Sequence, residues 1–162
     1  ELSVIDCAGA VLLDTLVRPS GPVPAEAAAI HGITDAMLAG APTWSEVHDR
    51  FCDLVEGRQV VIYNHEFDVR VISQTARRYG LQAPQGFDLV LDPGRIHCAM
   101  QAYAEFRGEW SAEKGQYRWQ KLSAAAAQQG VTVTNAHRAL GDCLMTLGVV
   151  RAMASTENAQ RV

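Results

Sequence analysis

The sequence predicts a single α/β domain in which a mixed sheet is flanked by helices. Two strand-like runs rich in aliphatic and β-branched residues open the chain, at residues 1–6 and 11–19. A third run, QVVIYN at residues 59–64, is apolar on both faces, as in a strand covered by helices on both sides. Helical patterns separate and follow these runs, and this alternation is typical of a sheet with helices on its faces.

Size and composition limit the class of protein. The chain has 162 residues, about the length of one ordinary domain, and its 48% hydrophobic and 20% charged residues exclude a disordered chain. Four dispersed cysteines without a C-x-x-C pair favour a reduced, cytoplasmic protein. No apolar run approaches the roughly 18 residues of a membrane span. A net charge of −4 argues against a generic nucleic-acid coat but permits a carboxylate metal site.

The first half of the chain predicts a hairpin and two helices. CAGA joins residues 1–6 and 11–19 into an antiparallel pair. Three prolines then enforce extended backbone before a short helical turn near Ala25 to Ile30. Thr43 and Glu46 form a capping-box pattern for a helix that ends at Gly57. Its expected inner face consists of Trp44, Val47, Phe51, Leu54 and Val55.

The second half predicts mainly helices. The strand at residues 59–64 is expected to be a parallel, inner member of the sheet. The elements that follow are a helix over 66–79 ending at Gly80, a strand over 87–92, a helix over 96–106, an Ala-rich helix over 123–129 closed by Gly130, and a last helix over 136–153.

The last helix carries an acid beside its expected apolar face. That face is formed by Leu140, Cys143, Leu144, Leu147 and Val150, and Asp142 stands at its edge. An ionised carboxylate there costs several kcal/mol unless a cation or hydrogen-bond donors compensate it. Residues five apart lie about 140° from each other on a helix, so His137 reaches Asp142 only from the helix start, where Thr134 or Asn135 can cap. Alternatively, Asp142 pairs with Arg138 on a solvated face and His137 is a surface residue.

A second polar group follows the buried strand, in YNHEFDVRVI. Asn64, His65, Glu66 and Asp68 crowd the carboxyl end of this strand, where ligands bind in open α/β sheets. Alternatively, Asp68 is merely favoured by the helix dipole and Asn64 is only a helix cap. The coincidence of two acids with a histidine favours a functional site.

These two segments resemble motifs of the DEDDh-type 3'-5' exonucleases, the family of the proofreading epsilon subunit of bacterial replicative polymerases. Asn64, Phe67 and Asp68 match the second motif, and His137, Ala139 and Asp142 match the last motif, H-x-A-x-x-D. IHGIT followed by TWSEV is similar to the family's lead-in, and LVRP to the end of its third strand. The resemblance covers essentially the whole chain.

The resemblance implies a ribonuclease-H-like fold and hydrolysis of the 3'-terminal phosphodiester of single-stranded DNA or RNA, which releases nucleoside monophosphates. It also implies two divalent cations, Mg²⁺ or Mn²⁺, which suit carboxylate ligands. A polymerase or a second copy of the chain would be a further partner. The implied roles are Asp68 and Asp142 as metal ligands, His137 as the base, and His31, Ile33, Asn64, His65 and Phe67 as substrate-binding residues.

The sequence departs from the family at its first motif, D-x-E, because Ala8 stands two positions after Asp6. The better register places residues 1–6 on the family's second strand, so that Glu1 is a structural strand residue. We therefore expect the domain, residues 1–162, to be N-terminally incomplete, to lack the first, central strand, and to cleave poorly as written. A catalytically inactive nucleic-acid-binding or polymerase-interaction module is the alternative, and a non-nuclease domain with chance motif matches is a third.

A segment rich in aromatic and basic residues could contact a single strand. Alternatively, Trp119 and Leu122 pack in the core while the basic side chains are solvated. The candidate contact residues are Phe106, Arg107, Trp110, Lys114, Tyr117, Arg118, Trp119 and Lys121.

Overall fold

The strands pair as three short two-stranded sheets. The computed structural model describes residues 1–87, 94–132 and 137–160. The pairs are antiparallel β1 (Leu2–Ile5) and β2 (Val11–Thr15), parallel β3 (Val60–Ile62) and β4 (Ile96–Cys98), and antiparallel β5 (Trp110–Ser111) and β6 (Gln116–Tyr117). The mixed α/β class is confirmed, but within these residues no backbone ladder joins the three pairs into the one sheet that was expected.

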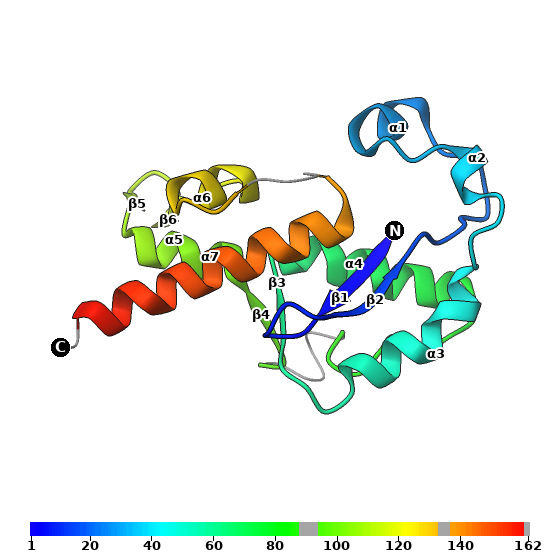
Figure 1. Ribbon diagram of the computed structural model, residues 1–162, viewed down its shortest axis with the longest axis horizontal. Coiled ribbons are helices and arrows are strands. Elements are labelled where there is room, and N and C mark those ends of the chain that lie inside the picture. Colours follow the sequence, from blue (N-terminus) through cyan, green and yellow to red (C-terminus); the bar gives the residue numbers. More distant parts are fainter. Residues whose placement is uncertain (88–93, 133–136, 161–162) are drawn as a thin grey trace.

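Helices account for most of the remaining ordered backbone (Figure 1). α7, the longest of them, contacts β1 as well as α5 and α6. No helix in the described residues is long and apolar enough to cross a membrane. The helices are α1 (Ala25–His31), α2 (Asp35–Leu38), α3 (Trp44–Val55), α4 (His65–Arg78), α5 (Ala99–Arg107), α6 (Leu122–Gln128) and α7 (Ala139–Gln160).

The predicted start of α3 is confirmed. Thr43 and Glu46 form both halves of the capping box, with the Thr43 backbone N–H donating to the Glu46 carboxylate at 2.7 Å. The helix buries Trp44 and Phe51, whose rings lie 6.0 Å apart between centroids. Phe51 in turn contacts the ring of Phe87 at 5.4 Å. This aromatic row forms part of the first of the two hydrophobic clusters in the described residues.

The helix expected over residues 96–106 is wrong at its start. Ile96, His97 and Cys98 form β4, and the helix begins only at Ala99. The reason is long-range pairing, because each of these three residues is matched in the parallel ladder with a residue of β3. The strand predicted over 87–92 lies outside the described residues except for Phe87.

The expected inner face of α7 is only partly confirmed. Leu140, Cys143, Leu147 and Val150 are half-buried, but Leu144 is exposed. The buried residues of α7 in the second hydrophobic cluster are Met145, Val149 and Met153. Apolar residues surround most of α7, so its neighbours decide which of them are buried, and α5 and α6 cover the Met145 side. Gly148 lets α7 lie close to the segment after α6, because a Cβ at this position would lie 2.6 Å from a methyl carbon of Val131.

Candidate active site

Two carboxylates, Asp68 in the first turn of α4 and Asp142 in the first turn of α7, lie close enough to influence each other. Burial, with a smaller contribution from the negative charge of Asp142, raises the pKa of Asp68 to about 6. Burial also raises the pKa of Asp142, opposed by a hydrogen bond from the backbone N–H of His137 at 3.3 Å. No cationic side chain in the described residues forms an ion pair with either acid. The negative charges of the two acids are therefore only weakly compensated by neighbouring groups.

Cys143 lies near the same acidic residues. Burial, together with the charges of Asp142, Asp68 and Asp14, raises the pKa of its thiol to about 11. The thiol donates to the carbonyl oxygen of Ser3 on β1 at 3.5 Å. A thiol with so high a pKa is protonated near neutral pH and is a poor nucleophile, so Cys143 contributes packing rather than chemistry.

Both acid-bearing helices begin after a residue in the left-handed backbone region. Asn64 has φ 60° and His137 has φ 69°, and no other non-glycine residue in the described part of the chain has a positive φ. Asn and His tolerate this region better than most side chains, though at some cost in free energy. The Asn64 side chain makes no capping hydrogen bond, which removes the simplest structural reason for its presence.

The last helix begins at Ala139 and not at residue 136 as expected, so His137 lies two residues before α7, and its backbone N–H reaches Asp142. Its side chain is exposed. The proposed capping residues Thr134 and Asn135 lie outside the described residues.

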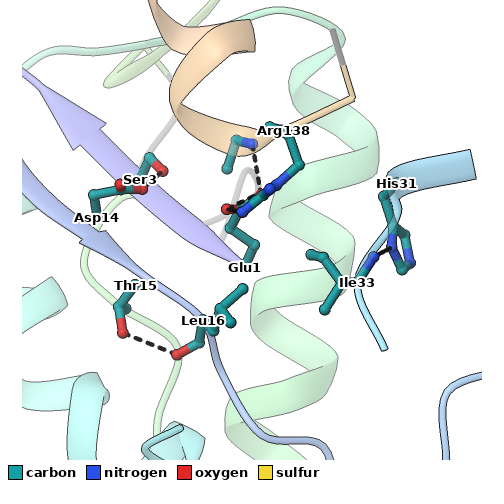
Figure 2. A network of polar contacts seen from close by, with 9 residues as sticks. Glu1, Ser3, Asp14, Thr15, Leu16, His31, Ile33 and Arg138 are labelled. Carbon is teal, nitrogen blue, oxygen red and sulfur yellow. Dashed lines mark hydrogen bonds and ion pairs between the residues drawn. The ribbon is translucent and has the colours of Figure 1, made fainter. Parts of the chain in front are cut away.

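Arg138 and Glu1 hold the start of α7 against the start of β1 (Figure 2). The Arg138 guanidinium donates to the Glu1 carboxylate from Nε at 3.0 Å and from Nη2 at 2.7 Å. The backbone N–H of Ala139 donates to the same carboxylate at 2.9 Å. Burial alone would raise the pKa of Glu1, but these hydrogen bonds outweigh it and the pKa lies below its usual value. The alternative in which Arg138 pairs with Asp142 is therefore wrong.

Glu1 has a larger part in the site than the sequence indicated. It was expected to be an ordinary strand residue, yet its carboxylate fixes the backbone that leads into His137 and Asp142. No local pattern could have revealed this, because the two partners are 137 positions apart.

His31 and Ile33 form a separate group near the end of α1. The backbone N–H of Ile33 donates to Nδ1 of His31 at 3.0 Å, and the Ile33 side chain is buried. Figure 2 shows both residues on a segment across from Glu1, and Figure 1 places α1 on the same side of the molecule as the start of α7. Within the described residues no hydrogen bond connects this group to Asp68 or Asp142.

The remaining two predicted substrate-binding residues differ in exposure. Phe67 is exposed, and the guanidinium carbon of Arg70 lies 5.6 Å from its ring centroid. His65 is half-buried, and its Nδ1 is buried without a hydrogen-bond partner among the described residues. Phe67 thus presents an exposed ring at the start of α4, whereas the unsatisfied nitrogen of His65 is enclosed.

The donor set around Asp68 and Asp142 fits a hard divalent cation. Mg²⁺ is often bound by one or two carboxylates, with water and phosphate oxygens completing its coordination. No group of three or more His, Cys, Asp or Glu side chains in the described residues is arranged to hold a metal. Two weakly compensated carboxylates are consistent with such an open, partly hydrated site.

Comparison with known proteins identifies relatives of the chain. The exonuclease (RNase T) family model matches residues 8–150. An uncharacterized exonuclease of Escherichia phage 186 is 52% identical over 155 residues, which are 95% of this chain and 78% of the relative. A DNA polymerase III subunit epsilon-like protein of Rhodobacter capsulatus is 36% identical over 138 residues, which are 83% of this chain but 17% of that protein.

A solved structure, Exonuclease X in complex with 5' overhanging duplex DNA, resembles the fold with a TM-score of 0.60. It is 26% identical, and the match covers 96% of this chain and 81% of that one. The hypothesis of a non-nuclease domain with chance motif matches is therefore wrong. Since the family match extends over most of the sequence, the chain belongs to the exonuclease family and has its ribonuclease-H-like fold.

Proposed function

We propose that this domain is a metal-dependent 3'-5' exonuclease that removes nucleoside monophosphates from single-stranded DNA. The observation that supports this most directly is the pair of weakly compensated carboxylates, Asp68 and Asp142, beside a histidine at the start of α7. The DNA polymerase and DNA-bound exonuclease names of the relatives favour DNA over RNA.

Each polar residue of the site has a distinct role in this proposal. Asp68 and Asp142 hold Mg²⁺ or Mn²⁺, which would supply positive charge to the attacking and leaving oxygens. His137 accepts the proton of the attacking water, because a neutral imidazole has a ring nitrogen that can take up a proton. The Glu1–Arg138 contact keeps the backbone of His137 and Ala139 in place.

The other predicted residues bind the strand end. The exposed ring of Phe67 stacks on a base, and Asn64 and His65 border the terminal nucleotide at the start of α4. His31 and Ile33 border the same nucleotide from the α1 side.

A degradation assay on the complete natural protein tests the proposal. A 5'-labelled single strand should shorten stepwise from its 3' end with Mg²⁺ or Mn²⁺ and remain intact in EDTA. A 3'-terminal phosphorothioate linkage should slow the first step. Equal degradation in excess EDTA would refute the mechanism, and DNA binding without hydrolysis under any metal would favour the inactive binding module.

His137→Ala tests the assignment of the base. The variant should lose about 100-fold or more in rate, the usual size of a general-base effect, while still binding Mn²⁺. His97→Ala is a matched control, because His97 is exposed on β4 and, within the described residues, its side chain hydrogen-bonds only that of Gln59. An unchanged rate in His137→Ala would contradict the role.

A further inference from the structure

We infer that residues 107–121, here called the aromatic hairpin, form a stacking surface for the single-stranded DNA that extends beyond the terminal nucleotide. The segment comprises β5, β6 and the residues that flank them. The inference rests on the proposed function and extends it to the rest of the substrate strand.

The aromatic rings of this hairpin are unusually exposed. Trp110 and Trp119 are 57% and 51% exposed, and Tyr117 is 38% exposed. The remaining tryptophan of the chain, Trp44, is buried in the core. The alternative that places Trp119 in the core is therefore wrong, although Leu122 does pack against the second hydrophobic cluster. Large aromatic surfaces left in water commonly mark a binding site.

The hairpin holds two of these rings in a defined arrangement. Trp110 and Tyr117 are cross-strand partners, and their ring centroids lie 5.2 Å apart in an edge-to-face contact. Backbone hydrogen bonds from Lys114 to Ser111 and from Arg118 to Glu109 close the turn and extend the pairing. Ser111 is buried, which anchors β5. A preformed surface of this kind loses little conformational entropy on binding.

Positive charge is concentrated in the same segment. Both lysines of the chain, Lys114 and Lys121, lie here, although acidic residues outnumber basic ones by 18 to 14 in the whole chain. Arg107 forms an ion pair with Glu109. Lys114, Arg118 and Lys121 have no ion-pair partner in the described residues. Available cations beside exposed rings match the phosphates and bases of a single strand better than they match a protein surface.

A hydrogen bond connects the hairpin to the proposed active site. The Tyr63 hydroxyl, at the end of β3, donates to the carbonyl oxygen of Gln120 at 2.8 Å. Tyr63 directly precedes Asn64, and Trp119 directly precedes Gln120. The end of the hairpin is thus fixed beside the start of α4, from which Asp68 extends.

Equilibrium binding of a fluorescent single-stranded DNA to the complete protein in EDTA tests this inference without cleavage. Trp110→Ala/Trp119→Ala should raise Kd about 10-fold or more, since stacking contributes strongly for each base. Trp110→Phe/Trp119→Phe retains aromatic rings and should keep most of the affinity. Thermal melting should be close to that of the wild type, because both side chains are largely exposed.

The salt dependence of Kd tests whether the positively charged side chains of the hairpin contact phosphates. Lys114→Ala/Arg118→Ala/Lys121→Ala should reduce the slope of log Kd against log salt by about 2, since each phosphate contact on a single strand contributes about 0.7. Arg78→Ala is the control, because Arg78 is exposed at the opposite end of α4 from Asp68. The control should leave the slope unchanged.

Hydrolysis of a nucleoside monophosphate nitrophenyl ester with Mn²⁺ separates the two proposals, because this small substrate cannot reach the hairpin. The hairpin variants should hydrolyse it as the wild type does. Failure of the wild type to hydrolyse it would refute the proposed function, while the binding data would still decide the role of the hairpin. An unchanged Kd in the double alanine variant, as expected if a protein partner or RNA occupied the hairpin, would overturn the inference.

Discussion

Replacing Arg138 by alanine should destabilise the protein and slow its reaction together. The Glu1 side chain is 11% exposed and its carboxylate accepts hydrogen bonds from the Arg138 side chain and the Ala139 backbone. Within the described residues, Arg138→Ala leaves this nearly buried charge with only the Ala139 N–H as a hydrogen-bond donor. Hydrogen bonds to charged groups contribute about 1.5–3 kcal/mol, and the 40% exposure of Arg138 argues for the lower part of that range. We expect the free energy of unfolding to fall by about 2 kcal/mol.

The effect on activity follows from the position of Arg138 between His137 and Asp142. Loosening the start of α7 displaces the proposed base relative to the proposed metal ligand, and small displacements cost about 10-fold to 100-fold in rate. We expect the rate constant to fall by that amount with little change in DNA affinity. Urea unfolding and the degradation assay measure the two effects in the same preparation.

Arg151→Ala is the matched control for this prediction. Arg151 lies on the same helix and donates to a neutral acceptor, the Cys7 carbonyl, at 2.7 Å. Loss of this hydrogen bond should lower the free energy of unfolding by about 1 kcal/mol or less and leave the rate of DNA degradation unchanged. A double-mutant cycle with Glu1→Gln should give a coupling energy above about 1 kcal/mol. If Arg138→Ala proves no less stable than Arg151→Ala, the anchoring role of Glu1 is refuted.

Two further predictions concern stability. Asp68 has a pKa of about 6 in the folded protein, whereas its ordinary value is 3.8. Ionisation of Asp68 therefore lowers the free energy of unfolding of the metal-free protein, with the full effect above pH 6 and no effect below pH 4. In EDTA, Asp68→Asn should therefore raise the free energy of unfolding by about 2 kcal/mol at pH 7.5, after allowance for partial exposure, and should leave it unchanged near pH 4. An equal increase at both pH values would contradict the raised pKa of Asp68. Gly148→Ala should lower the melting temperature despite alanine's better helix propensity, because its Cβ would lie 2.6 Å from Val131. Adding Val131→Ala should recover most of the loss, and a Gly148→Ala protein as stable as the wild type would refute the clash.

The sequence was most informative where nearby residues determine the structure. The capping box of Thr43 and Glu46 predicted the start of α3, and the hairpin of β1 and β2 followed from two aliphatic runs around a short turn. Two separated motifs also predicted that Asp68 and Asp142 would meet, and each acid does lie in the first turn of its helix.

Long-range partners account for what the sequence could not predict. Ile96–Cys98 continues into a helical pattern and becomes a strand only because β3 lies beside it. The apolar residues of α7 surround most of the helix, so periodicity could not distinguish Met145 from Leu144 as the buried residue. Arg138 has an acid four positions away at Asp142, yet it binds Glu1 because β1 begins beside the start of α7.

The left-handed residues Asn64 and His137 have a consequence for protein engineering. Glycine at either position would relieve roughly 1 kcal/mol of backbone strain, and asparagine at position 68 would remove a costly buried charge. Each of these changes eliminates a side chain that the proposed reaction uses. A library of this domain selected only for heat resistance would therefore accumulate its first gains at the expense of catalysis, so any thermostabilised form must be screened for DNA hydrolysis at every round.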